Sequence, residues 1–133
     1  MAENTEALNI LMLSGEFSKL EAAALVSMMS ASYGKTVRIF VSMDALPAFH
    51  KDPQVAAQVQ MSPVATRIKE KSDDYLTLLR QAKEMGDVHI YACSLVMDLY
   101  GWKLDDFQEG IFDDALGVAG FLAQSEGQPV MNF

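Results

Sequence analysis

The chain contains one cysteine, Cys93, within the segment GDVHIYACSLVMDLYGW at residues 86–102. An apolar run precedes Cys93 and a helix-like segment follows it, so we expect the residue at the carboxyl end of a strand and directly before a helix. Backbone N–H groups and the helix dipole favour an anion there, whether a thiolate, a persulfide or a sulfenate. The alternative is a buried, unreactive side chain, because free cysteine is among the most buried residue types.

Two other predicted strands end near chemically useful residues, at Ser14-Gly15 and at Met43-Asp44. The carboxyl ends of parallel strands share one edge of a sheet, and ligands bind at that edge. Ser14 and Gly15 could offer backbone N–H groups to a ligand, or could form a simple turn. Met43 could line an apolar pocket suited to sulfur, together with Met61 and Met97, or these methionines could fill the core.

Ser94 and Leu95 directly follow Cys93 and would place the first N–H groups of the helix beside its sulfur. These two residues complete the predicted site of Cys93, Ser14, Gly15 and Met43.

The two histidines are weaker candidates. His89 lies within a predicted strand, where a structural role is more common than that of a base. His50 lies in a segment without clear periodicity and could reach Cys93, although a solvated loop histidine is the simpler interpretation. Tyr100 and Trp102 could form a partner or subunit patch, or could close the core.

Composition excludes several classes of protein. The 133 residues suit one domain, 1–133, and the net charge of -8 with scattered Lys and Arg argues against nucleic-acid binding. One cysteine excludes an intramolecular disulfide and a Cys-x-x-Cys motif, and no metal or other cofactor is expected. No apolar run is long enough for a membrane span, and the acidic start does not resemble a signal peptide. A cytoplasmic protein is expected.

Apolar runs alternate with capped, helix-like segments along the chain. This alternation predicts an α/β fold, a doubly wound parallel sheet with helices on both faces. The strands are expected at residues 8–13, 36–43, 87–93, near 110–112 and at 129–133. Helices are expected over residues 18–33 with a Ser18–Glu21 capping box, over 72–85, over 94–100 and over 115–126 capped by Asp114. The stretch from Pro47 to Lys71 is expected to be mobile and to border the Cys93 site.

The segment HIYACSLVMDLYGWKLDDF resembles the DsrE/DsrF-like family, in its peroxiredoxin-like branch. The opening residues LNILMLSGEFSKLEAAALVSMMSASYGKTVRIFVSMDALPAF and the later ALGVAGFL are similar to the same pattern. The resemblance implies a flavodoxin-like three-layer sandwich with about five parallel strands and a homo-oligomer, often a trimer or hexamer. It also implies that Cys93 matches the cysteine on which better-understood members carry sulfur as a persulfide.

Two functions remain open. In the first, Cys93 accepts sulfane sulfur from a donor and passes it to a small sulfur-carrier protein, a sulfurtransferase half-reaction. In the second, the chain is a non-enzymatic oligomeric binding or redox-sensing module whose cysteine is structural or oxidisable. A peroxidase is disfavoured because no arginine lies near Cys93 in the sequence.

Overall fold

The computed structural model describes residues 7–133, so the first six residues of the predicted domain lie outside the described part. Five strands form one parallel sheet in the order β4-β3-β2-β1-β5. The strands are β1 (Leu8–Met12), β2 (Val37–Val41), β3 (Val88–Cys93), β4 (Asp114–Leu116) and β5 (Val130–Asn132).

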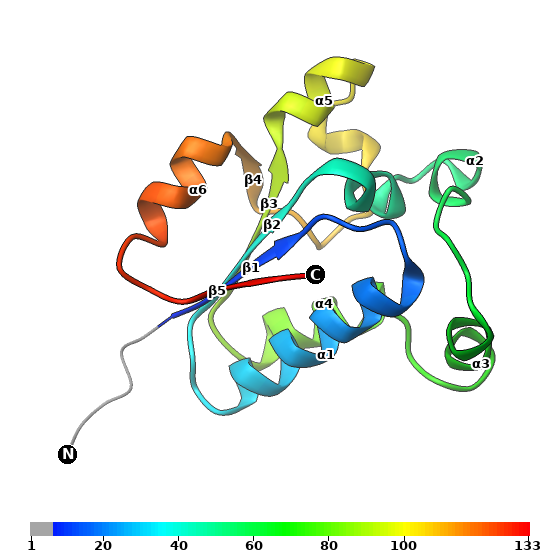
Figure 1. Ribbon diagram of the computed structural model, residues 1–133, viewed down its shortest axis with the longest axis horizontal. Helices are drawn as coiled ribbons and strands as arrows, with labels where there is room; N and C mark the ends of the chain where they lie inside the picture. Colours follow the sequence, from blue (N-terminus) through cyan, green and yellow to red (C-terminus); the bar gives the residue numbers. More distant parts are fainter. Residues whose placement is uncertain (1–6) are drawn as a thin grey trace.

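Helices cover both faces of the sheet (Figure 1). On one face lie α1 (Phe17–Ser32) and α4 (Tyr75–Met85), and on the other lie α5 (Ser94–Tyr100) and α6 (Val118–Gln124). The predicted three-layer α/β fold with five parallel strands is therefore confirmed. Its strand order differs from the 2-1-3-4-5 order of flavodoxin itself, so the likeness lies in the layers and the parallel sheet.

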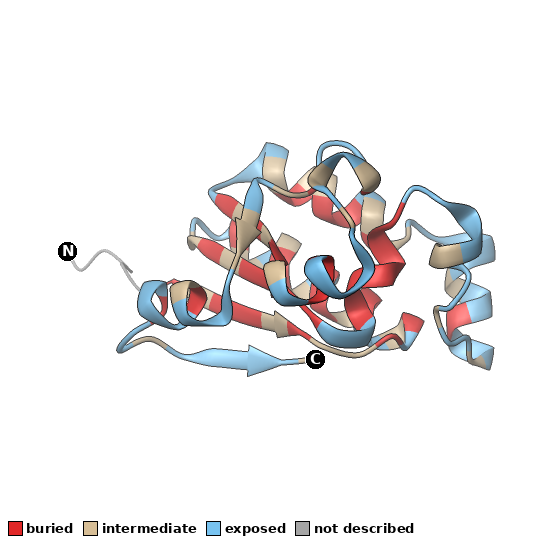
Figure 2. Cartoon of the chain, turned by 90° about the horizontal axis from the view of Figure 1, so that it is seen from above, coloured by how far each residue is buried: buried red, intermediate tan, exposed pale blue. Residues whose placement is uncertain are grey.

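The core lies on both sides of the three central strands, which read as nearly continuous apolar runs (Figure 2). Phe40 of β2 stacks on Phe121 of α6, with ring centroids 5.3 Å apart. Because successive side chains in a strand point to opposite faces, Ile39 and Val41 point towards the layer of α1 and α4. Both residues are fully buried, so β2 is packed on both faces.

Two predicted helix starts are wrong. Helix α1 begins at Phe17 with Glu16 as its N-cap, so Ser18 lies in the first turn and forms no capping box. Glu21 is buried towards the α4 layer instead of reaching back to the helix start. Helix α4 is capped by Asp74, whose carboxylate accepts a hydrogen bond from the Thr77 backbone, and not by a residue at 72.

The predicted fourth strand is displaced along the chain. Ile111 is fully buried but lies outside the sheet, and the strand pairing with β3 begins at Asp114, opposite Tyr91. Asp113 links the segment before β4 to β3. Its backbone N–H donates to the Ile90 carbonyl, and its carboxylate accepts from the Ile90 N–H. Asp114 is therefore a strand residue, and α6 begins at Val118 after Gly117.

The segment after β2 is more ordered in secondary structure than its sequence indicates. It contains the 3-10 helix η1 (Met43–Phe49), α2 (Pro53–Ala56) and α3 (Pro63–Lys71). Residues 45–50 are buried, whereas most of residues 51–73 are exposed. The expected mobility stays a prediction for the exposed part, while η1 belongs to the core.

Helix α1 has apolar residues nearly all round its axis, but one chain covers only part of it. It packs on the sheet and on α4, yet Leu25, Met29 and Tyr33 are exposed on one side. Nowhere in residues 7–133 is there a helix of the length and hydrophobicity that crossing a membrane requires.

Candidate functional site

The site is built on the sheet face that carries α5 and α6. Strand register places Leu11 of β1 beside Phe40 of β2, and Phe40 beside Tyr91 of β3. Since side chains alternate along a strand, Cys93 lies on the same face as Tyr91, two residues further on. The cysteine therefore ends the row of side chains that faces α5 and α6, at the carboxyl edge of the sheet.

Cys93 lines a cavity of about 190 Å³. Its walls come from β1 and β2 and the turns that follow them, from α5 and from α6. The lining residues are Leu11, Leu13, Phe40, Ser42, Met43, Cys93, Leu95 and Val118. Apart from the thiol, no lining side chain ionises, and the Ser42 hydroxyl is the one other polar side-chain group in this lining.

Burial differs sharply between the cysteine and the rim of the cavity. Cys93 is 3% exposed, whereas Leu95 is 58% and Val118 is 56% exposed. The sulfur thus lies at the inner wall of an apolar recess whose mouth is formed by side chains from α5 and α6. A small molecule or a narrow chain end can approach Cys93 there without contact with a charged side chain of the lining.

Met43 stands at the end of β2 in an unusual conformation. Its φ is 49°, which makes it the one non-glycine residue within 7–133 that has a positive φ. Non-glycine residues in this region carry steric strain and cluster at functional sites. This conformation turns the chain from β2 into η1, and the Met43 side chain lies in the wall of the cavity.

The structure brings together three of the six predicted site residues. Cys93, Met43 and Leu95 line the cavity, whereas Ser14, Gly15 and Ser94 do not. The Ser14 backbone N–H donates to the Phe133 carbonyl, so that group is not free for a ligand.

Gly15 has a structural reason to be glycine. A Cβ at this position would lie 2.9 Å from the Asp44 carbonyl oxygen. The turn after β1 and the turn after β2 therefore approach closely enough to exclude a side chain at residue 15. Gly15 lines a second, adjoining pocket with Met43 and Asp44.

The three methionines do not form one pocket. Met97 is buried in the core, and Met61 lines a different hollow between α2 and α4. Of the three, Met43 alone lines the cysteine cavity.

The solvated interpretation of His50 is wrong. His50 is 8% exposed, and its ring lies 4.8 Å from the Trp102 ring and 5.6 Å from the Phe107 ring. Its Nδ1 accepts from the Asp52 N–H, and its buried Nε2 has no hydrogen-bond partner among residues 7–133. It does not line the Cys93 cavity.

His89 has a structural role away from the site. Its Nε2 lies 2.7 Å from Asp87 Oδ1, near the start of β3. A hydrogen bond from Thr36 and pairing with His89 hold the pKa of Asp87 below its ordinary value. Cys93 lies at the other end of the same strand, so His89 is not its base.

Tyr100 and Trp102 close part of the core, and their role in a partner or subunit patch stays a prediction. Their rings stack with centroids 4.4 Å apart, and Trp102 packs on His50 and Phe107. Tyr100 is 62% exposed, so this stack continues from the core to the surface.

The residues missed by the sequence are the apolar walls of the cavity. Leu11 and Phe40 were expected in strands, but nothing in their spacing indicated that they face the cysteine. Within the described residues no group of acidic, histidine or cysteine side chains could hold a metal ion.

A family model described as the DsrE/DsrF/DrsH-like family matches residues 56–131, more than half of the chain and including Cys93. The chain belongs to this family. A curated relative is the uncharacterized protein YrkE of Bacillus subtilis (strain 168), which is 26% identical over 155 aligned positions. The alignment covers 95% of this chain and 95% of YrkE.

Two solved structures share the fold. The ychN protein from E. coli has a TM-score of 0.65 and 13% identity, with 97% of this chain and 100% of that chain covered. MTH1491 from Methanobacterium thermoautotrophicum, a protein of unknown function, has a TM-score of 0.58 and 16% identity, with coverages of 96% and 99%. At these identities the likeness concerns the fold alone.

Proposed function

We propose that the protein is a sulfur-relay protein that carries sulfane sulfur as a persulfide on Cys93. The observation that carries this proposal is the place of the thiol, which is 3% exposed at the inner wall of an apolar cavity. Membership of the DsrE-like family, which is related to sulfur relay, supports the same function.

The half-reaction needs only the thiolate of Cys93. The thiolate attacks the outer sulfur of a donor persulfide, R–S–SH, and the donor S–S bond breaks. The donor leaves as the thiolate R–S⁻, and Cys93 becomes Cys93–S–SH, so atoms and charge balance and no separate oxidant is required. Passing the sulfur to an acceptor thiol is the same exchange in the opposite direction.

The cavity suits a persulfide for physical reasons. A volume of about 190 Å³ admits one additional sulfur atom on Cys93 without displacing the walls. Apolar contacts favour the polarisable sulfur, and no second thiol exists in the chain to remove it. The exposed rim at Leu95 and Val118 offers a contact surface to a donor or carrier protein.

Oligomerisation belongs to the same proposal. The exposed apolar side of α1, with Leu25, Met29 and Tyr33, would be covered by a second copy. We propose a cytoplasmic homo-oligomer, a trimer or hexamer of single-domain chains.

Alkylation of the native protein tests whether the thiol reacts. The rate of Cys93 modification by a small reagent is measured against pH, with the same reagent and urea-unfolded protein as the control. A titrating, reactive thiol is expected. A thiol that stays inert at about pH 8, near the ordinary pKa of cysteine, would favour the alternative of a binding module with a structural cysteine.

A further inference from the structure

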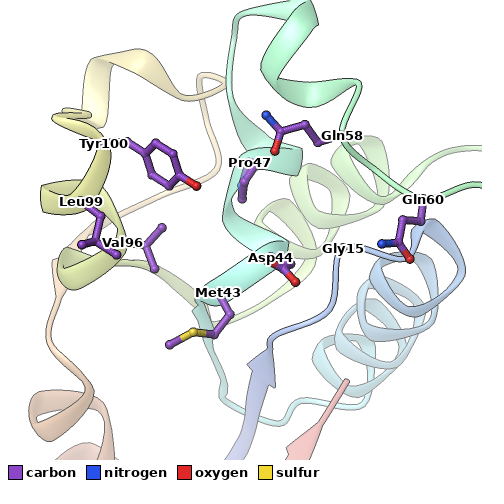
Figure 3. Close-up of a pocket in the computed structure, with 9 residues that line it drawn as sticks. All are labelled: Gly15, Met43, Asp44, Pro47, Gln58, Gln60, Val96, Leu99 and Tyr100. Atoms are coloured by element: carbon purple, nitrogen blue, oxygen red, sulfur yellow. The ribbon is translucent and has the colours of Figure 1, made fainter.

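The second pocket adjoins the cysteine cavity and differs from it in chemistry. Its volume is about 350 Å³, and it lies between α5, η1 and the linker from α2 to α3 (Figure 3). Its lining residues are Gly15, Met43, Asp44, Pro47, Gln58, Gln60, Val96, Leu99 and Tyr100. Where the cysteine cavity is apolar, this pocket has a carboxylate, two carboxamides and a phenol.

Two backbone hydrogen bonds join the linker to the β1–α1 connection at Gln60. The Gln60 N–H donates to the Gly15 carbonyl at 2.8 Å, and the Phe17 N–H donates to the Gln60 carbonyl at 2.9 Å. These bonds leave the Gln60 carboxamide free to line the pocket. The turn after β1, the start of η1 and the linker together line one side of the pocket.

Asp44 is the only charged side chain in that lining. Within residues 7–133 it forms no ion pair, and no hydrogen bond to its carboxylate is found. In Figure 3 it lies at the centre of the pocket, between Met43 and Gly15, and the Tyr100 hydroxyl points towards η1 from the opposite wall. An unpaired carboxylate among neutral hydrogen-bonding groups favours a cationic ligand group and repels an anionic one.

The two pockets share a wall. Met43 lines both, and the consecutive α5 residues Leu95 and Val96 line the cysteine cavity and the polar pocket respectively. The two pockets therefore adjoin at Met43 and along α5.

We infer that the polar pocket binds the ammonium group of a small aminothiol that takes sulfur from Cys93. This inference rests on the proposed persulfide function and names its acceptor class. The acceptor thiolate R–S⁻ attacks the outer sulfur of Cys93–S–SH, that S–S bond breaks, and the products are R–S–SH and the Cys93 thiolate. The ammonium group stays on Asp44 during the exchange and takes no part in the chemistry.

The test uses three thiols that differ in charge but little in size: cysteamine (cationic), 2-mercaptoethanol (neutral) and 3-mercaptopropionate (anionic). Protein carrying a Cys93 persulfide is mixed with each thiol, and loss of the persulfide is followed by intact mass. Each rate is divided by the rate at which the same thiol removes the persulfide from urea-unfolded protein at the same pH, so that neither the thiolate fraction nor the intrinsic nucleophilicity of the thiol produces the order.

We expect cysteamine to react about tenfold faster than 3-mercaptopropionate, with 2-mercaptoethanol between them, because the two charged thiols interact oppositely with one nearby carboxylate. Asp44→Asn should reduce this spread, the ratio of the corrected cysteamine and 3-mercaptopropionate rates, to about twofold. The matched control is Glu84→Gln, which removes one negative charge from an exposed position on α4, across the sheet from the pocket. It should leave the spread unchanged.

Three results would overturn the inference. The first is equal corrected rates for the three thiols, and the second is a spread that survives Asp44→Asn. The third is a Glu84→Gln variant that reduces the spread as much as Asp44→Asn does, because the preference would then come from the net charge of -8. Each leaves the persulfide function intact. Failure of Cys93 to form a persulfide at all is a different outcome, because it contradicts the proposed function before any acceptor is added.

Discussion

Replacing Glu21 should stabilise the protein in a pH-dependent way. Glu21 is 3% exposed in the second turn of α1, and its Oε1 has no hydrogen-bond partner within the described residues. Burial, followed by the negative charges of Asp74 and then Asp73, raises the pKa of Glu21 from 4.5 to about 7. Tyr75, at the start of α4, is coupled to the same carboxyl group, and burial is the main cause that raises its pKa.

The sign follows from proton binding. Between the unfolded pKa of 4.5 and the folded pKa of about 7, the folded chain holds a proton on Glu21 that the unfolded chain has lost. The free energy of unfolding therefore falls as pH rises through this window. At about 1.4 kcal/mol per pKa unit, the shift corresponds to a loss of about 3 kcal/mol between acidic and alkaline solution.

Glu21→Gln removes the titrating group while keeping its shape. Urea unfolding at about pH 5 and about pH 8 should show the variant more stable than the parent by about 3 kcal/mol at the higher pH, and by much less at the lower pH. Glu84→Gln, on the exposed surface of α4, is the control and should leave the free energy of unfolding unchanged at both pH values. If Glu21→Gln changes the free energy of unfolding by the same amount at both pH values, the group does not titrate in this window and the reasoning is refuted.

Three further changes test the geometry of the site. Gly15→Ala places a Cβ 2.9 Å from the Asp44 backbone carbonyl and should cost about 1–3 kcal/mol in thermal unfolding. Gly120→Ala meets only the flexible end of Leu116 at the same distance, so an equal loss for both variants would contradict this explanation. Met43→Val puts a β-branched residue at a φ of 49° and should lower the free energy of unfolding by about 1–3 kcal/mol. Met43→Asn should be tolerated, because asparagine adopts positive φ more readily. If Met43→Asn were the less stable of the two, strain at this residue would be refuted. Methyl methanethiosulfonate fits the cavity and should modify native Cys93 readily, while a bulky maleimide dye should react only after unfolding; equal access for both reagents would mean that the cysteine is not recessed.

The layers of the fold were predictable because burial on both faces leaves a direct trace in sequence. Strands β1 to β3 are apolar runs, and Cys93 is at the carboxyl end of β3 as expected. Local signals failed where tertiary contacts decided the outcome. Ser18 and Glu21 match a capping motif, but the N-cap is Glu16, two residues earlier, and Glu21 is buried instead of reaching back to the helix start.

The details of the site depend on partners far apart in the chain. Val118 of α6 reaches the cysteine only because β4 lies beside β3, which sequence spacing does not encode. His50 was expected in solvent because its neighbours are polar and proline-rich, yet Trp102 and Phe107 cover it from another segment. Gln60 reaches its pocket through a backbone hydrogen bond to Gly15, in the turn after β1.

The most direct test of the sulfur-relay proposal is intact mass spectrometry of the protein as isolated and after treatment with a persulfide donor. The chain should gain the mass of one sulfur atom, a reducing agent should remove that mass, and Cys93→Ser should gain none. Because Cys93 is the only cysteine, the added sulfur can be assigned without further mapping. A wild-type chain that gains no sulfur from any donor, although its thiol is alkylated at neutral pH, would contradict the proposal.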